Sequence, residues 1–157
     1  MKKFLLIIFI IFLTGCSNTN KEEDNKSEYI AIKSNLLEEE ITNETAEELP
    51  VDITITLDRL DEEKINYKVV LNNPKENMYD IKSLVVHNYY SDEIFPSLGV
   101  FNNEKELLVD SEEQKEIELT GTIKTTKNIS NMNLEIKLWL QYTDDSGEIK
   151  EIYYKTT

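Results

Sequence analysis

Few residues in this sequence could carry out chemistry by themselves. Cys16 is the one cysteine and His87 the one histidine among 157 residues. A catalytic triad or a histidine metal site needs further bases, nucleophiles or ligands beside such a histidine. We therefore expect a structural or surface role for His87, and we expect neither catalytic residues nor a cofactor nor a metal site.

Carboxylates are the second kind of reactive group, and they are abundant. Asp144, Asp145 and Glu148 surround Gly147, and their oxygens are ligands that a calcium ion prefers. A hairpin turn uses the same residue types for backbone reasons, and we favour the turn. The acid run 38–40 lacks the Gly-turned ligand spacing of a calcium loop, and no pair of carboxylates is singled out as in a glycosidase.

Cys16 has a different setting, because it follows an export signal. Residues 1–16 read MKKFLLIIFIIFLTGC, with two lysines before an unbroken apolar run over residues 4–13. Such a run would rise about 15 Å as a helix, roughly half the hydrocarbon thickness of a bilayer. It is therefore too short to span a membrane and has the layout of a cleavable secretory signal.

The four residues Leu13, Thr14, Gly15 and Cys16 resemble the lipobox of bacterial lipoproteins. The resemblance implies that the signal peptidase recognises Leu13–Gly15 and cuts before Cys16, whose thiol carries a diacylglycerol. Lipidation also explains a lone cysteine in an exported protein, which has no intrachain disulfide partner. We expect residues 1–15 to be a signal peptide and the protein to be lipid-anchored at the extracytoplasmic face of the cell membrane. The alternative is a plain secretory signal with an incidental cysteine.

The charge balance predicts an acidic protein. The formal net charge is −14, and removal of residues 1–15, which carry two lysines and no acid, makes it −16. Such a charge repels nucleic acid, which we exclude as a partner. Residues 16–49 combine acids with Asn, Ser and Thr, and we expect a flexible acidic tether there. Two alternatives stay open within it: an edge strand over residues 29–32, and one helical turn with Leu36, Leu37 and Ile41.

From residue 50 onward, apolar and polar residues alternate as in half-buried β-strands. Strand signals are punctuated by turn residues, with Asn72-Asn73-Pro74 closing the second run. The third run requires a slip in alternation, which a β-bulge explains. The expected strands cover residues 51–58, 65–71, 79–87, 114–125, 134–142 and 149–155.

The register of the last hairpin follows from its apolar residues. A three-residue loop over 145–147, with Gly147 in the left-handed conformation, pairs Leu140 with Ile152. Both inner faces are then apolar, whereas a two-residue loop would turn Ile152 outward. The bulged loop also places Trp139 opposite Tyr153 on the outer face.

Length and strand pattern together predict one domain of an all-β class. A chain of 157 residues accommodates a single ordinary domain and excludes a large multidomain enzyme. We predict an antiparallel β-sandwich over residues 50–157. The pattern resembles the immunoglobulin-like or fibronectin-III-like modules of bacterial surface lipoproteins, without the disulfide and tryptophan signature of true immunoglobulin domains.

Two aromatic surfaces are candidates for binding. The segment 87–101 looks like a long connection between the sheets, and its aromatic residues could form a recognition loop or pack on a sheet edge. The outer face with the Trp139–Tyr153 pair could anchor a protein or glycan, or merely stabilise the sheet. The candidate binding residues are Tyr89, Tyr90, Phe95, Phe101, Trp139 and Tyr153.

These features predict a membrane-anchored lipoprotein with a non-enzymatic binding or envelope-accessory role. Its partners would be membrane lipid, through the Cys16 diacylglycerol, and an envelope protein or glycan. One alternative is an immunity or exclusion lipoprotein that protects against a toxin or phage. A weaker alternative is a hydrolase that uses carboxylates the sequence does not single out.

Overall fold

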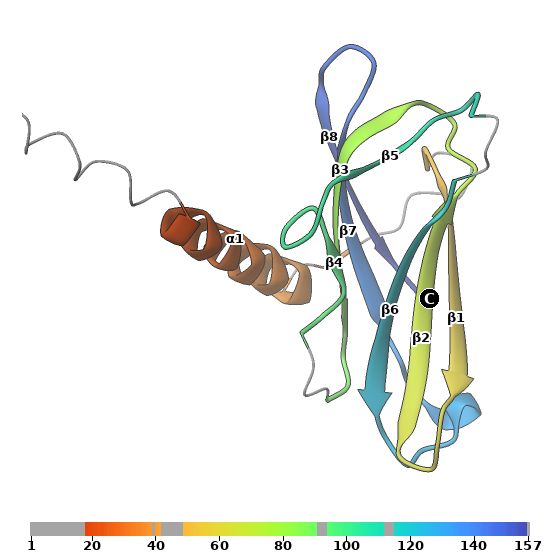
Figure 1. Ribbon diagram of the computed structural model, residues 1–157. Helices are drawn as coiled ribbons and strands as arrows, with labels where there is room; N and C mark the ends of the chain where they lie inside the picture. Colours follow the sequence, from red (N-terminus) through yellow and green to blue (C-terminus); the bar gives the residue numbers. More distant parts are fainter. Residues whose placement is uncertain (1–17, 39, 42–48, 91–93, 112–114, 157) are drawn as a thin grey trace, which may run out of the picture.

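The computed structural model describes residues 18–38, 40–41, 49–90, 94–111 and 115–156. It contains one long helix and two facing antiparallel sheets (Figure 1). The elements are α1 (Asn18–Glu38), β1 (Asp52–Arg59), β2 (Lys64–Asn72), β3 (Met78–His87), β4 (Ser97–Leu98), β5 (Lys105–Leu107), β6 (Ile117–Lys124), a 3-10 turn (Ile129–Asn131), β7 (Ile136–Thr143) and β8 (Ile149–Lys155).

The sheet topology confirms the predicted antiparallel sandwich. One sheet has the order β1-β2-β6 and the other the order β4-β3-β7-β8, with β5 paired to the start of β3. One sheet thus combines β1 and β2 with β6, and the other combines β3, β4 and β5 with the C-terminal hairpin of β7 and β8. The chain therefore crosses between the sheets, as it does in immunoglobulin-like sandwiches. The alternating residues located the six long strands, although β3 and β7 are buried on both faces over several residues.

The C-terminal hairpin has the predicted register. Leu140 pairs with Ile152 and Trp139 with Tyr153 across β7 and β8. Gly147 has a φ of +82°, and its N–H donates to the Asp144 carbonyl at 3.0 Å. The left-handed glycine after a tight turn is the bulged loop that the apolar pattern required.

The predicted bulge in the third strand is also present. The register of β3 against β7 shifts between Tyr79 and Lys82, and Asp80 has a φ of +49°. A shift of this kind lets Met78 and Ile81, three residues apart, both lie in the inner apolar cluster, whereas Leu84 lies in the cluster on the other side of the sheet.

The segment 87–101 differs from its predicted course. It leads from β3 into β4, which pairs with β3 in the same sheet, so it does not connect the two sheets. The chain crosses to the other sheet later, after β5 and before β6. Neither β4 nor β5 was expected, because strands of two or three residues are too short to show alternation.

The N-terminal segment is a helix where a flexible tether was expected. The 21 residues of α1 would extend roughly 31 Å. Its C-terminal half lies beside β3 and β4, and its other end points away from the sheets (Figure 1). Tyr29, Ile32 and Leu36 follow one another at helical spacing and pack against the sandwich. The edge strand considered for residues 29–32 is therefore wrong, and the short helical turn at Leu36 belongs to a longer helix.

Arg59, at the end of β1, ties together the loops at one end of the sandwich. Its guanidinium donates to the carbonyls of Asp61 at 3.0 Å, Glu62 at 3.2 Å and Thr125 at 3.3 Å, and also to that of Lys127. A planar group with five donors suits carbonyls that come from two loops.

We expect Arg59→Ala to lower the free energy of unfolding by about 1–2 kcal/mol, because several charge-assisted hydrogen bonds are lost at an exposed site. Arg59→Lys should restore only part of this, since an ammonium cannot reach all four carbonyls. Denaturant unfolding measures both variants, with the exposed Lys64→Ala as control. Equal stability of wild type and Arg59→Ala would contradict this role.

Candidate functional site

The structure separates the six aromatic residues predicted to bind. Tyr90 and Phe101 have exposed fractions of 71% and 45%. Trp139 is 4% exposed, and the other three side chains are half-buried: Tyr89, Phe95 and Tyr153. Only Tyr90 and Phe101 thus present substantial surface to a partner.

The Trp139–Tyr153 face is not an open surface, because α1 covers it. Trp139 packs in a cluster with Leu84 and Val86 of β3 and with Leu36 of α1, while Tyr153 lies at the cluster's edge. The two residues do lie opposite each other on the outer side of the sheet, as the register predicted. The helix that covers Trp139 was not predicted, so the exposure expected for this residue was wrong.

Polar contacts hold α1 in place over this face. Glu28 pairs with Lys82 of β3 at 2.8 Å, and the Tyr29 hydroxyl accepts a hydrogen bond from the Phe95 N–H at 3.0 Å. The Lys33 ammonium lies 4.9 Å from the centre of the Phe95 ring. Burial raises the pKa of Tyr29 above its ordinary value, although the bond from Phe95 opposes this. Phe95 therefore helps to dock the helix.

His87 is a buried part of the packing, in line with the structural role favoured from the sequence. It is 4% exposed, and its ring meets those of Tyr67 and Phe95 edge to face at 5.4 and 5.0 Å. Its Nδ1 accepts the Tyr89 N–H at 3.2 Å. Burial lowers the pKa of His87, so the neutral form is favoured.

The exposed aromatic Phe101 belongs to a groove beside β6. The groove has a volume of about 410 Å³ and runs between the segment 94–102 and the edge of that strand. Its apolar wall consists of Ile94, Pro96 and Phe101, and β6 contributes Glu118, Leu119 and Thr120. Ile94 is 75% exposed. We call this the β6 groove, and it is the candidate binding site that the structure supports best.

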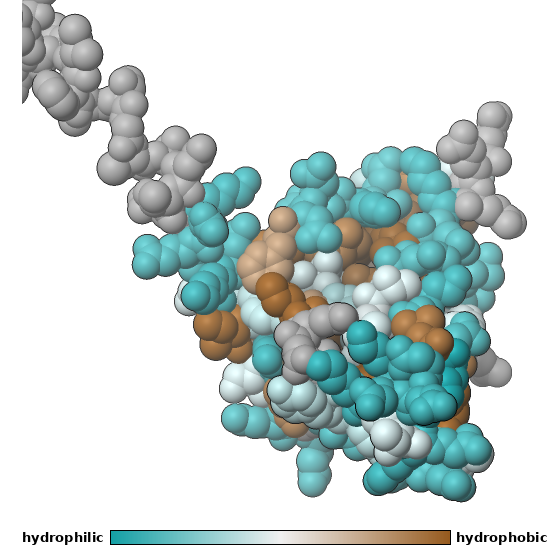
Figure 2. Space-filling view, turned by 60° about the horizontal axis from the view of Figure 1, so that its bottom comes forward, coloured by the Kyte–Doolittle hydropathy of each residue, from teal (hydrophilic) through white to brown (hydrophobic). Residues whose placement is uncertain are grey.

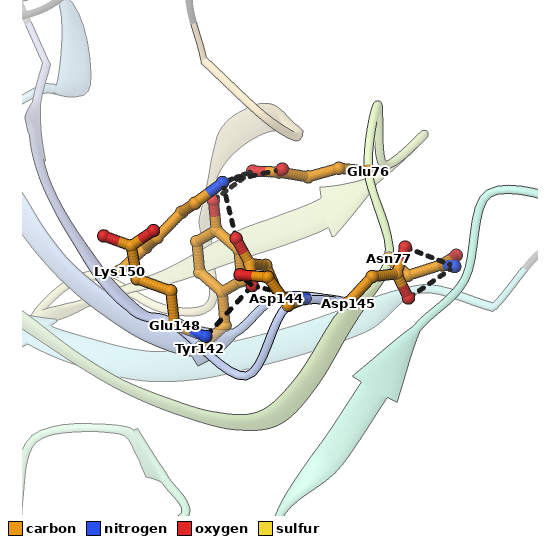
Figure 3. Close-up of polar contacts among 8 residues, drawn as sticks. Glu76, Asn77, Tyr142, Asp144, Asp145, Glu148 and Lys150 are labelled. Atoms are coloured by element: carbon orange, nitrogen blue, oxygen red, sulfur yellow. Dashed lines mark hydrogen bonds and ion pairs between the residues drawn. The ribbon is translucent and has the colours of Figure 1, made fainter.

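Two of the acids at the tip of the last hairpin, Asp144 and Asp145, are engaged by the protein's own groups (Figure 3). Asp144 Oδ1 accepts bonds from the N–H and hydroxyl of Ser146 and from the N–H of Glu148, and its Oδ2 lies 3.1 Å from the Lys150 ammonium. Asp145 instead accepts bonds from Asn77 and Tyr79. The two carboxylates thus serve different partners and do not converge as calcium ligands do.

Lys150 extends this network to the loop before β3. Its ammonium lies 2.8 Å from Glu76, which also accepts a hydrogen bond from the Tyr142 hydroxyl. These bonds, that of Lys150 foremost, hold the pKa of Glu76 below its usual range. Among the residues that the structure describes, no group of three or more His, Cys, Asp or Glu side chains is arranged to hold a metal ion.

The pKa of Asp144 predicts a pH-dependent contribution to stability. The Ser146 hydroxyl above all, then Lys150 and two backbone N–H groups, outweigh burial and hold this pKa well below its ordinary value. The unfolded chain therefore binds the proton more readily, so the stabilisation is complete above the unfolded pKa, about 4, and is lost as the pH falls below it.

We expect Asp144→Asn to lower the melting temperature at pH 7, and the difference from wild type to shrink as the pH falls from 5 to 2. Thermal unfolding across this range measures it. Glu148→Gln, at an exposed position in the same loop, is the control. A difference that does not change with pH would show that the charge of Asp144 contributes nothing.

The predicted lipidation residues Leu13, Thr14, Gly15 and Cys16 lie outside the described residues. Within the described part, no helix is long and apolar enough to cross a membrane.

Comparisons with known proteins add little to this geometry. No family model matches the chain, and no curated protein matches it. Among solved structures, the chain is similar to the crystal structure of Spo0M, a sporulation control protein from Bacillus subtilis. The two share 11% identity with a TM-score of 0.26, over 68% of this chain and 48% of Spo0M. The chain thus spans about half the length of that protein, and we base the fold on the sheet topology alone.

Proposed function

We propose that this protein is a lipid-anchored lipoprotein of the extracytoplasmic membrane face, whose sandwich binds another envelope component without catalysis. The sequence Leu13-Thr14-Gly15-Cys16 behind its apolar run is the observation that carries the proposal. Two acyl chains hold a protein stably at a bilayer, whereas a single chain binds only marginally.

The position of Cys16 supports a link between the lipid and the sandwich that runs through α1. Cys16 lies two residues before Asn18, where α1 begins, and α1 packs against β3 and β7. A lipid at Cys16 would therefore be joined to the sandwich through a docked helix. Confinement to the membrane raises the effective concentration of membrane neighbours, so that a small interface can suffice for binding.

The binding role is supported by the β6 groove and by the hydrophilic character of the face drawn in Figure 2. Ile94 and Phe101 are exposed apolar residues beside an edge strand. Hydrophilic residues dominate the face drawn in Figure 2, where hydrophobic residues form small separate groups. A groove with an apolar wall on such a surface is a natural place for a partner to bind.

Intact mass and cell fractionation test the anchor. Wild-type protein should start at Cys16, carry the mass of a diacylglycerol and remain with membranes. Cys16→Ala should lose both the added mass and the membrane location, while Ser17→Ala should keep them. An unmodified, soluble wild-type protein would overturn the anchor.

Crosslinking of the intact protein in membranes tests the binding role. Mild crosslinking followed by affinity purification should enrich a defined envelope component in wild type, and less of it in Ile94→Asp, which places a charge in the groove. Recovery of no envelope component from either protein would contradict a binding role.

A further inference from the structure

The outer edge of β6 offers hydrogen-bonding groups to a partner. β6 ends its sheet and pairs with β2 on one side only. The N–H of Lys124 points away from β2 and donates to the Tyr90 carbonyl at 3.2 Å. Because backbone directions alternate along a strand, Glu118, Thr120 and Thr122 turn the same way. Their N–H and C=O groups therefore face the open edge.

Among the residues that the structure describes, neighbouring groups leave one part of this edge accessible. At its C-terminal end, Tyr90 covers Lys124 and the backbone of Thr122 interacts with His87. At its N-terminal end, Glu118 and Thr120 border the β6 groove instead. The accessible edge is thus short, and it lies directly beside apolar side chains.

The side chains along this part of β6 determine which residues an added strand would need. Glu118 and Thr120 are exposed on the outer face, whereas Leu119 turns inward and is 5% exposed. A strand added here would place alternate side chains beside Glu118 and Thr120, and the ones between them against Ile94, Pro96 and Phe101.

Charge specifies the residue that would lie opposite Glu118. Lys68 of β2 pairs with this carboxylate at 2.8 Å from one side and lowers its pKa, so that Glu118 is ionised. The open side lies toward the groove, and Glu116, also exposed, precedes β6. A basic residue there would continue the row of opposite charges, and the net charge of −14 attracts cationic segments.

We propose that the β6 groove binds an extended, basic peptide segment as an added β-strand. The segment pairs its backbone with Glu118 and Thr120, sets a Lys or Arg beside Glu118 and inserts an apolar side chain between Ile94 and Phe101. This inference rests on the proposed binding role and names the kind of partner. It needs no lipid, so peptide binding in solution tests it separately from the anchor.

The probe is the blocked peptide Thr-Leu-Lys-Val-Lys, and its control is Thr-Leu-Glu-Val-Glu. Titration of the isotope-labelled protein should shift the amide signals of Glu118, Thr120 and the segment 94–102. We expect the lysine peptide to bind about tenfold more tightly than the glutamate peptide, because attraction to Glu116 and Glu118 becomes repulsion. Equal affinity for both peptides, or shifts elsewhere, would overturn the proposal.

Two variants separate backbone pairing from charge. Thr120→Pro removes an outward N–H without breaking the β2–β6 ladder, and should weaken the lysine peptide about tenfold. Thr120→Val keeps the N–H and should bind normally. Glu118→Lys should reverse the preference toward the glutamate peptide, which tests the proposal even if the proline variant fails to fold.

A second copy of this chain is the competing occupant of the edge. If the protein forms a concentration-dependent dimer that Thr120→Pro abolishes, and no peptide binds, the edge serves self-association and the proposal is wrong. Sedimentation at several protein concentrations distinguishes these outcomes. If the peptide binds as expected but no envelope partner is ever crosslinked, the groove is real and the proposed cellular role is at fault.

Discussion

Replacing Leu36 with aspartate is expected to release α1 from the sandwich and expose Trp139 to water. Leu36 belongs to α1, and its side chain is fully buried against the outer face of β3 and β7. Loss of its burial and introduction of an unpaired charge should lower the free energy of unfolding by about 3 kcal/mol or more. Trp139 is the one tryptophan, so its fluorescence should shift to longer wavelength before global unfolding.

Leu37→Asp provides a matched control on the same helix. Leu37 is 44% exposed, and the same substitution one residue further along should leave the Trp139 emission and the stability close to wild type. If Leu36→Asp also leaves the emission unchanged, then α1 does not depend on this contact for docking.

Gly121→Ala is expected to disrupt the core from within β6. A Cβ at this position would lie 2.4 Å from the Tyr67 hydroxyl and 2.5 Å from its ring carbon Cζ. Tyr67 is 1% exposed and packs against His87, so its ring has little room to move. We expect a loss of about 1–3 kcal/mol in the free energy of unfolding, as for other overpacked cores.

The Tyr67→Leu background identifies the cause of this loss. Without the ring, Gly121→Ala should cost markedly less than in wild type, and a double-mutant cycle from denaturant unfolding measures the coupling. A cost that is the same in both backgrounds would mean that the ring is not responsible.

The sandwich could be predicted from the sequence because the alternation that marks each long strand involves only residues close together in the chain. Alternation of apolar and polar residues located the long strands, and the register of the last hairpin followed from placing Leu140 and Ile152 inside. A bulge in β3 was predicted by placing Ile81 and Leu84 on one face, but these residues lie on opposite sides of the sheet. The bulge that the structure has lies earlier, between Tyr79 and Lys82.

The helix could not be predicted in the same way. Tyr29, Ile32 and Leu36 do lie at helical spacing, but the exposed Ile30 and Leu37 lie among them and obscure the apolar side. The surface that stabilises α1 is formed by β3 and β7, whose positions depend on the whole sandwich. The acids around these residues therefore led to the prediction of a flexible, solvated tether.

The candidate site was predicted only in part. Phe101 was named from its aromatic segment, and it does line the β6 groove. Glu118 and Thr120 fall within the strand predicted over residues 114–125, but nothing local indicates that β6 ends its sheet. Edge position is a property of topology, and it became visible only with the order of all the strands.

The docking of α1 also constrains the order in which the chain matures. The helix precedes all the strands in the chain, yet Trp139 and the rest of β7 that it covers follow a hundred residues later. Until those residues have emerged and paired, Leu36 has no apolar surface to contact, and contacts so distant in sequence form late in folding. A helix that precedes the whole sandwich in the chain is therefore among the last elements to reach its final place.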